Sequence, residues 1–173
     1  MSRHVILVDE QNHATGTMEI VAAHSGEGTL HRAFSVYVFS PDKSSLIIQQ
    51  RSNKKMLFPL IWANTCCSHP LEKEEMIASG QRRLKEELGF SVPLKAGPSF
   101  VYRAKDPDGK GSEYEHVTTL IGTAPKGIVV RPDPDEAAAW KWIDIPTLLN
   151  DLEKYPDFFA LWLKIGLEKI LDR

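Results

Sequence analysis

The chain has 173 residues, 42% hydrophobic and 25% charged, which is ordinary for one globular domain. Because 21 Lys and Arg residues nearly balance 23 Asp and Glu residues, we exclude a global positive field of the kind that binds nucleic acid or membrane surfaces. A chain of this length buries a sizeable core without disulfides or a structural metal, so we expect a single domain spanning residues 1–173.

The cysteines and the N-terminal sequence indicate where the protein works. Cys66 and Cys67 are sequence neighbours, and a bridge between them would be strained because disulfides usually join Cα atoms about 4.4–6.8 Å apart. The apolar run at residues 5–8 is too short for a signal peptide core or a membrane span. We therefore expect reduced thiols and a cytoplasmic location.

The first third of the chain alternates strand-forming runs with turn-forming residues. The expected strands or extended segments are residues 4–8, 15–21, 32–39 and 46–50, the last two as a hairpin. Between the second and third, His24 and His31 flank two glycines, which can bend the loop and bring the imidazoles together. An isolated loop histidine is more often a solvated surface group.

A basic cluster and the cysteine stretch follow the hairpin. Arg51, Lys54 and Lys55 are either a solvated loop or a site for a phosphate-bearing ligand. In the extended segment at residues 62–70, Cys67 and His69 lie two residues apart and share one face. This geometry suits a site with a metal and a thiol, although free cysteine often only fills a core.

Apolar residues at helical spacing predict a helix over residues 72–88, with acidic residues in its first turn and Gly89 as its C-cap. Glu86 and Glu87 crowd the last turn, where negative charge is unfavourable by roughly 0.3–1 kcal/mol per group. Local stability gives no reason for this pair, whereas a bound cation would.

The rest of the chain predicts further strands and two helices. The expected elements are strands at residues 99–103 and 116–122, further segments at 127–130 and 139–143, and helices at 146–154 and 157–171. Glu113 and Glu115 alternate onto one face of a strand, where they repel unless one is protonated or a cation lies between them. Trp162 falls at a helical spacing that is typical of core residues.

Five side chains recur as candidate metal ligands: His24, His31, His69, Glu113 and Glu115. This mixed nitrogen and oxygen set suits a divalent ion such as zinc or manganese. Cys67 would sit beside the ion, and a nearby cation lowers the pKa of a thiol.

Four segments together resemble the type I isopentenyl-diphosphate isomerase family: residues 31–36, 64–70 and 81–89, and Glu113-Tyr114-Glu115. The resemblance runs from about His4 to the C-terminus. It implies an α/β (α+β) Nudix fold, in which a mixed β-sheet lies between helices. Leu60 is a departure, because it stands where the family usually has glycine.

The resemblance extends in part to the Nudix signature. The chain keeps the signature residues Glu74, Arg82, Leu84, Glu86, Glu87 and Gly89. Ser68 replaces the first glycine and Arg83 replaces a glutamate, so the hydrolase metal cluster is incomplete.

The implied reaction is the reversible conversion of isopentenyl diphosphate to dimethylallyl diphosphate. Cys67 and Glu115 would be the two acid/base groups, and Tyr102 would hydrogen-bond Glu115. The five candidate ligands would hold Mn²⁺, Zn²⁺ or Mg²⁺, and Glu87 would bind a Mg²⁺ that also meets the diphosphate. The resemblance further assigns phosphate binding to Arg51, Lys55, Arg83 and Lys85, and contact with the carbocation to Trp162.

Two other functions remain open at this point. A Nudix diphosphohydrolase would use Glu86 and Glu87 to hold magnesium and activate water on a nucleoside-diphosphate substrate. A non-catalytic metal-binding module would use the histidines and glutamates for structure alone. For the isomerase we expect a monomer whose partner is a small isoprenoid diphosphate, with no nucleic acid or membrane involved.

Overall fold

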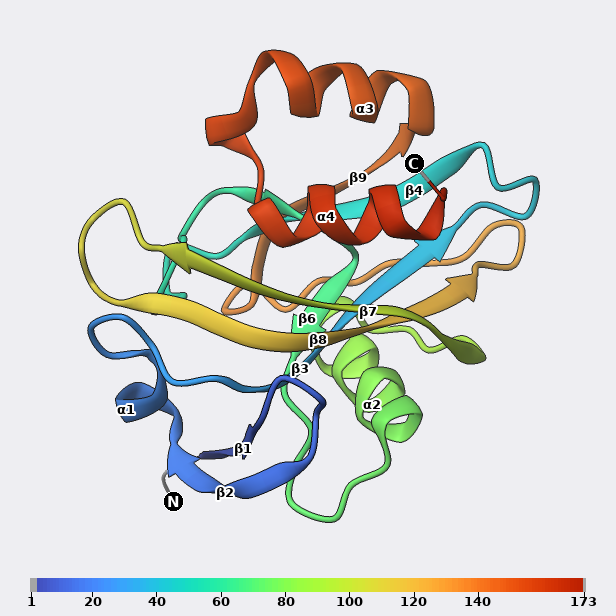
Figure 1. Cartoon of the computed structure of the whole chain (residues 1–173). Helices are drawn as coiled ribbons and strands as arrows, with labels where there is room; N and C mark the ends of the chain where they lie inside the picture. The colour runs from blue at the N-terminus through green and yellow to red at the C-terminus, as the bar shows by residue number, and fades with distance from the viewer. Residues whose placement is uncertain (1–2, 173) are drawn as a thin grey trace.

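Strands from along the whole chain form one mixed β-sheet in the computed structural model, which describes residues 3–172 (Figure 1). The strands are β1 (His4–Val8), β2 (Ala14–Glu19), β3 (His31–Phe39), β4 (Ser45–Arg51), β5 (Trp62–Ala63), β6 (Cys66–Ser68), β7 (Leu94–Lys105), β8 (Ser112–Thr123) and β9 (Ala137–Asp144). The helices are α1 (Ile20–His24), α2 (Met76–Leu88), α3 (Ile145–Lys154), the 3-10 turn η1 (Pro156–Phe158) and α4 (Leu161–Ile170). Within residues 3–172, no helix has the length and apolar character of a membrane span.

β3 is the strand around which the sheet is assembled. It runs parallel to β8 along its whole length, starting from the pair His31 and Glu115, and antiparallel to the short strand β6. β4 meets β3 only at the pair Phe39 and Leu46, and otherwise lies along β9. The predicted hairpin is therefore wrong beyond its closing turn, because β6 occupies the edge of β3 that β4 would have used.

Alternate residues of β3 point to opposite faces of the sheet and feed two cores. Ala33 and Tyr37 belong to the core under α3 and α4, whereas Phe34 and Val36 belong to the core under α2. Figure 1 shows α3 and α4 on one side of the strands and α2 on the other. The prediction of a mixed sheet between helices is confirmed, and the shared strand supports the single domain that we propose.

Helix α2 begins four residues later than predicted. Lys73 has a φ of 65°, in the left-handed region, which a helix cannot continue through. Glu74 precedes the helix, where its carboxylate accepts a hydrogen bond from the Leu71 backbone at 2.9 Å. At the other end Gly89 is the predicted C-cap, with a φ of 75°.

The predicted C-terminal helix is interrupted. Phe159 bridges to Trp62 of β5, and the Ala160 backbone N–H donates to the Trp62 carbonyl at 2.8 Å. This pairing holds the chain extended between η1 and α4. The Tyr37 hydroxyl then donates to the carbonyl oxygens of Trp162 and Leu163 at 2.9 and 3.3 Å, which fixes the start of α4 against β3.

Three other local predictions differ from the structure. The expected second strand ends at Glu19, whose side chain accepts from the Ala22 backbone and caps the short helix α1. Residues 127–130 form a turn and loop rather than a strand. The strands β7 and β8 extend beyond their predicted bounds because they pair with each other.

We predict that Gly166→Ala destabilises the protein more than Gly80→Ala does. A methyl group at Gly166 would collide with the buried Tyr37 ring and hydroxyl, whereas one at Gly80 would meet the ends of two flexible leucine side chains. Both changes gain helix propensity of about 1 kcal/mol, but overpacking costs typically 1–3 kcal/mol. Urea unfolding of both variants measures the difference, and equal stability would contradict the packing of α4 described above.

Candidate active site

The five predicted metal ligands converge in one buried cluster. One side-chain nitrogen or oxygen from each of His24, His31, His69, Glu113 and Glu115 lies within 4.8 Å of all the others. The ring centroids of His24 and His31 are 4.7 Å apart, so the glycine-containing loop does bring the two imidazoles together. The spacing of the cluster matches that of ligands around a single metal ion.

The sheet places these ligands. Parallel pairing sets His31 of β3 opposite Glu115 of β8, and strand alternation puts Glu113 on the same face as Glu115. Because β6 lies along the other edge of β3, the residue after it, His69, reaches the same place. His24 arrives from the last turn of α1.

Backbone carbonyls orient two of the imidazoles. His24 Nδ1 donates to the Ile20 carbonyl at 2.7 Å, and His31 Nδ1 donates to the Thr29 carbonyl at 2.7 Å. With Nδ1 donating to a carbonyl, Nε2 of each ring faces the cluster, where loss of its proton would free a lone pair for a metal ion.

The cluster fits a divalent metal ion. His31 Nε2 and His69 Nε2 lie 3.0 Å apart, and His69 Nε2 also lies 2.8 Å from Glu115 Oε1. In this buried cluster the two carboxylates repel each other, and so do the lone pairs of the three imidazoles. A shared cation would relieve both repulsions.

Burial and neighbouring charges separate the proton affinities in the cluster. Burial and the Glu115 charge raise the pKa of Glu113. Burial also opposes ionisation of Glu115, but hydrogen bonds from His31 and His69 hold its pKa well below the usual range. Burial lowers the pKa of His69 to about 4. Burial disfavours the charged form of His24 as well, but Glu113 outweighs it and raises that pKa to about 9.

A cavity of about 190 Å³ opens next to the cluster. The residues that line it are Arg3, Ile20, His24, Arg51, Lys55, Met56, Leu57, Cys67, Ser68, His69, Arg83, Tyr102, Glu113, Glu115, Glu136 and Trp162. Every predicted catalytic residue and most of the predicted substrate-binding residues are among them. The cavity therefore joins a thiol, three carboxylates, aromatic rings and several cations.

Lys85 is a predicted phosphate ligand that lies elsewhere. Its ammonium donates to the Gly89 carbonyl at 3.2 Å, and the residue is exposed. Successive helical residues are about 100° apart, so Lys85 points roughly opposite to Arg83, two residues earlier. Lys85 therefore has no place in the site that we propose.

Cys67 is the cavity thiol, and Cys66 faces the other way. The Cys67 sulfur lies 3.6 Å from Arg51 Nη1, whereas Cys66 belongs to the core under α2. Burial raises the pKa of Cys67 to about 12, although the Arg51 charge opposes this shift. In the metal-free chain burial therefore outweighs the Arg51 charge, and the thiol stays protonated near neutral pH. The lowering of this pKa by a bound cation stays a prediction.

Tyr102 and Trp162 form an aromatic wall beside Glu115. The Tyr102 hydroxyl donates to Glu115 Oε2 at 3.0 Å, as the resemblance implied. The Trp162 ring centroid lies 5.7 Å from that of Tyr102 and 5.4 Å from the Arg51 guanidinium carbon. Trp162 is therefore both a core residue and a cavity residue.

Arg51 is held rigidly at the end of β4. The register of β4 against β9 shifts between Gln50 and Arg51, and the Arg51 guanidinium donates to the carbonyls of Leu57 and Phe58 at 2.8 and 2.9 Å. Leu60 in the same loop has a φ of 63°, which explains why glycine suits that position.

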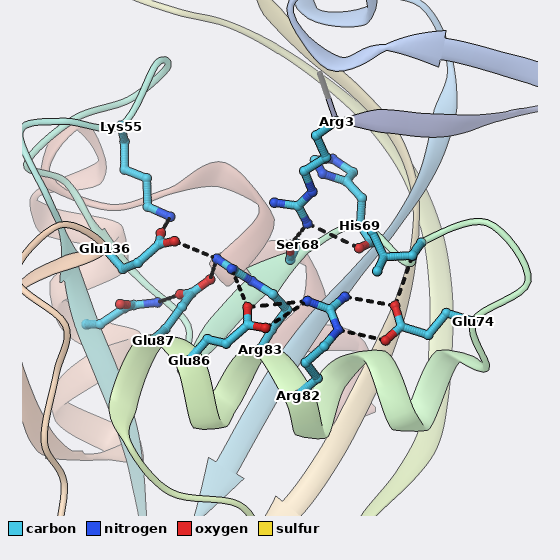
Figure 2. Close-up of polar contacts among 12 residues, drawn as sticks. Arg3, Lys55, Ser68, His69, Glu74, Arg82, Arg83, Glu86, Glu87 and Glu136 are labelled. Atoms are coloured by element: carbon cyan, nitrogen blue, oxygen red, sulfur yellow. Dashed lines mark hydrogen bonds and ion pairs between the residues drawn. The ribbon is translucent and has the colours of Figure 1, made fainter. Parts of the chain in front are cut away.

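Arginines neutralise the acidic end of α2 (Figure 2). Arg83 donates to Glu86 at 2.7 Å, to Glu87 at 2.6 Å and to Glu136 at 2.9 Å, and Gln49 donates to Glu87 at 2.8 Å. The idea that local stability gives no reason for the Glu pair is wrong, because these partners compensate both charges.

Sequence reasoning missed Gln49 and Glu136, together with a further cavity residue, Arg3. Glu136 also pairs with Lys55. All three reach the site through contacts between segments far apart in the chain, and no local pattern marks them.

Comparison with known proteins identifies the fold family of this chain. The family model of the NUDIX domain matches residues 29–162. A crystal structure of a protein from Deinococcus radiodurans is similar over 88% of this chain and 90% of its own, with a TM-score of 0.65 and 19% identity. A MutT NUDIX hydrolase from Burkholderia pseudomallei gives a TM-score of 0.60 at 18% identity, covering 82% and 98% of the two chains. These likenesses show the NUDIX fold.

Curated relatives show to which family within the NUDIX fold this chain belongs. Isopentenyl-diphosphate Delta-isomerase of Halorhodospira halophila is 39% identical, with 93% of this chain and 91% of the relative covered. Isopentenyl-diphosphate Delta-isomerase 2 of Aromatoleum aromaticum is 40% identical, with 99% and 88% covered. The isopentenyl-diphosphate Delta-isomerase of Burkholderia multivorans is 39% identical, with 98% and 93% covered. The chain belongs to the isopentenyl-diphosphate Delta-isomerase family.

We predict that Glu113→Gln weakens binding of Mn²⁺ by roughly tenfold or more, because it removes an anionic ligand from the cluster. Equilibrium dialysis with metal analysis measures the affinity. His13→Ala is the matched control, since His13 is exposed and pairs only with Asp9 in the described chain. Equal affinities for Glu113→Gln and the wild type would contradict metal binding at this cluster.

Proposed function

We propose that this isomerase interconverts isopentenyl and dimethylallyl diphosphate with Cys67 and Glu115 as its acid/base pair. The observation that carries the proposal is that both groups line one cavity with opposite protonation. Burial raises the pKa of Cys67 to about 12, whereas histidine hydrogen bonds hold the pKa of Glu115 well below its usual range. The resting site thus holds one proton donor and one proton acceptor.

Isomerisation needs this combination. One group adds a proton to the terminal alkene carbon, which leaves a tertiary cation, and the other removes a proton from the carbon nearer the diphosphate. Such proton transfers contribute typically 10²–10⁴-fold each to the rate. Because no atom is gained or lost overall, the two groups exchange protonation states in each direction and the reaction is reversible.

Tyr102 and Trp162 support the charged intermediate. The faces of aromatic rings attract cations by about 0.5–2 kcal/mol, more strongly when water is excluded. The Tyr102 hydroxyl also fixes one oxygen of Glu115, which leaves that carboxylate in one orientation toward the cavity. Both residues are buried, so the cation would form away from water, which would otherwise trap it as an alcohol.

The five-ligand cluster would hold Mn²⁺, Zn²⁺ or Mg²⁺, whose charge would position Glu113 and Glu115 and tune their proton affinity. At the polar end of the cavity, Arg51, Lys55 and Arg83 would bind phosphate oxygens. Glu87 would be a ligand of a Mg²⁺ ion that arrives with the diphosphate. Its carboxylate would then face two positive groups, this ion and its present partner Arg83.

The same contacts disfavour a Nudix hydrolase. Arg83 stands where the signature has a glutamate, and it pairs with both Glu86 and Glu87. This arginine replaces a metal ligand by a cation and leaves fewer carboxylates to activate water. A purely structural metal module would in turn have no use for the cavity with Cys67, Tyr102 and Trp162.

We also propose that the protein acts as a cytoplasmic monomer on a small isoprenoid diphosphate, without nucleic acid or membrane partners. The adjacent free cysteines and the near balance of charge support this setting.

We predict that Cys67→Ala lowers the rate of dimethylallyl diphosphate formation by roughly 10²–10⁴-fold, because an acid/base group is lost. The neighbouring Cys66→Ala is the matched control, since it removes a buried thiol that faces the α2 core, and its rate should stay within a few-fold of the wild type. NMR assay of isopentenyl diphosphate measures both rates. Equal activity of the two variants would remove Cys67 from the mechanism.

A further inference from the structure

Arg3 reaches the active-site cavity from the position just before β1. Its carbonyl oxygen accepts a hydrogen bond from the Ile20 backbone at 2.9 Å, which ties it to the first residue of α1. Its side chain donates from Nη2 to Ser68 Oγ at 2.7 Å and to the His69 carbonyl at 3.3 Å. In Figure 2 the Arg3 guanidinium lies on the same side of α2 as Arg83 and Glu136. Arg3 thus links the N-terminal strands to the segment that carries Cys67 and His69.

The charge environment of Arg3 differs from that of Arg83 and Lys55. Arg83 pairs with Glu86, Glu87 and Glu136, and Lys55 pairs with Glu136. Within residues 3–172, the Arg3 side chain donates its hydrogen bonds to the neutral oxygens of Ser68 and His69. Within the same range it forms no ion pair with a carboxylate. A partly buried guanidinium loses part of its hydration, and without an anionic partner no ion pair offsets this free-energy cost.

Nearby positive charge sharpens this imbalance. Burial lowers the pKa of Arg3, and the charges of Arg83 and Arg82 lower it further, against weaker opposing effects of Glu136 and Glu87. Several cations therefore converge at one end of the cavity beyond what the carboxylates compensate. A multiply charged anion is the ligand that would correct this imbalance.

The fork of the guanidinium suits phosphate. Both hydrogen bonds from Arg3 to described residues use Nη2, whereas a guanidinium carries five N–H donors in fixed geometry. Ser68 lines the cavity too, and its hydroxyl accepts from Arg3 and retains its own hydrogen for donation. The pair can therefore present donors to one phosphate group while remaining bonded to each other.

We propose that Arg3 is a further residue of this isomerase that binds the diphosphate group of the substrate. This inference rests on the proposed function for the identity of the substrate. Arg3 binds the anion from the N-terminal side of the cavity. The other three cations bind it from elsewhere in the fold: Arg51 from the end of β4, Lys55 from the loop after β4, and Arg83 from α2.

The decisive variant is Arg3→Gln in the full-length protein, because the amide can still donate to Ser68 but carries no charge. We expect the KM for isopentenyl diphosphate to rise roughly 10–100-fold while kcat stays within about threefold, since the group acts on binding rather than on proton transfer. Arg3→Lys should recover part of the loss. Arg103→Ala is the control, because it removes an equal charge from an exposed arginine that stacks on Tyr114.

Calorimetric titration with inorganic pyrophosphate gives a readout independent of turnover. Its affinity should fall in Arg3→Gln by about the same factor as the KM rises, and it should not change in Arg103→Ala. Thermal unfolding and metal content should match the wild type in every variant, which separates anion binding from a structural role.

The outcomes separate this inference from the proposed function. Unchanged KM and pyrophosphate affinity in Arg3→Gln would overturn the role of Arg3, whatever the wild type catalyses. A lowered kcat with unchanged pyrophosphate affinity would overturn it too, since Arg3 would then act through the structure around His69. A third outcome is that the wild type does not isomerise isopentenyl diphosphate, while Arg3→Gln still binds pyrophosphate more weakly than the wild type. The proposed function then fails, and the anion site at Arg3 stands.

Discussion

The parallel pairing of β3 with β8 is the constraint on which the whole site depends. It sets His31 opposite Glu115, and the alternation along β8 places Glu113 beside them. Because β6 takes the other edge of β3, Cys67 and His69 arrive at the same end of the sheet. A shift of one residue in the β3–β8 register would turn both glutamates to the opposite face, so the register of the strands also fixes the chemistry.

Charge is organised differently at the two ends of the cavity. Around the histidine cluster, burial and hydrogen bonds push proton affinities apart, so that the Cys67 thiol holds its proton while the Glu115 carboxylate is ionised. At the other end, permanent cations outnumber the carboxylates that pair with them, and Arg3 has neutral partners. One end is thus suited to moving a proton and the other to holding an anion.

Strand periodicity was enough to pair Cys67 with His69 and Glu113 with Glu115, because residues two apart on a strand share a face. The two glycines between His24 and His31 predicted the rest of the cluster. Helical spacing and a following glycine predicted the cap at Gly89. Such local patterns failed where distant segments decide: the β3–β4 hairpin is displaced by β6, and Lys85 was grouped with Arg83 by proximity in sequence although a helix turns them apart. Arg3 and Glu136 were missed for the same reason, since only the folded chain brings them to α2.

The most direct test of the acid/base account is to incubate the metal-loaded protein with isopentenyl diphosphate in heavy water and follow the products by NMR. Addition and removal of protons by two side chains predicts dimethylallyl diphosphate that carries deuterium, and deuterium in the isopentenyl diphosphate that remains as equilibrium is approached. Intact substrate without deuterium, or release of inorganic phosphate or pyrophosphate in place of the isomer, would contradict it.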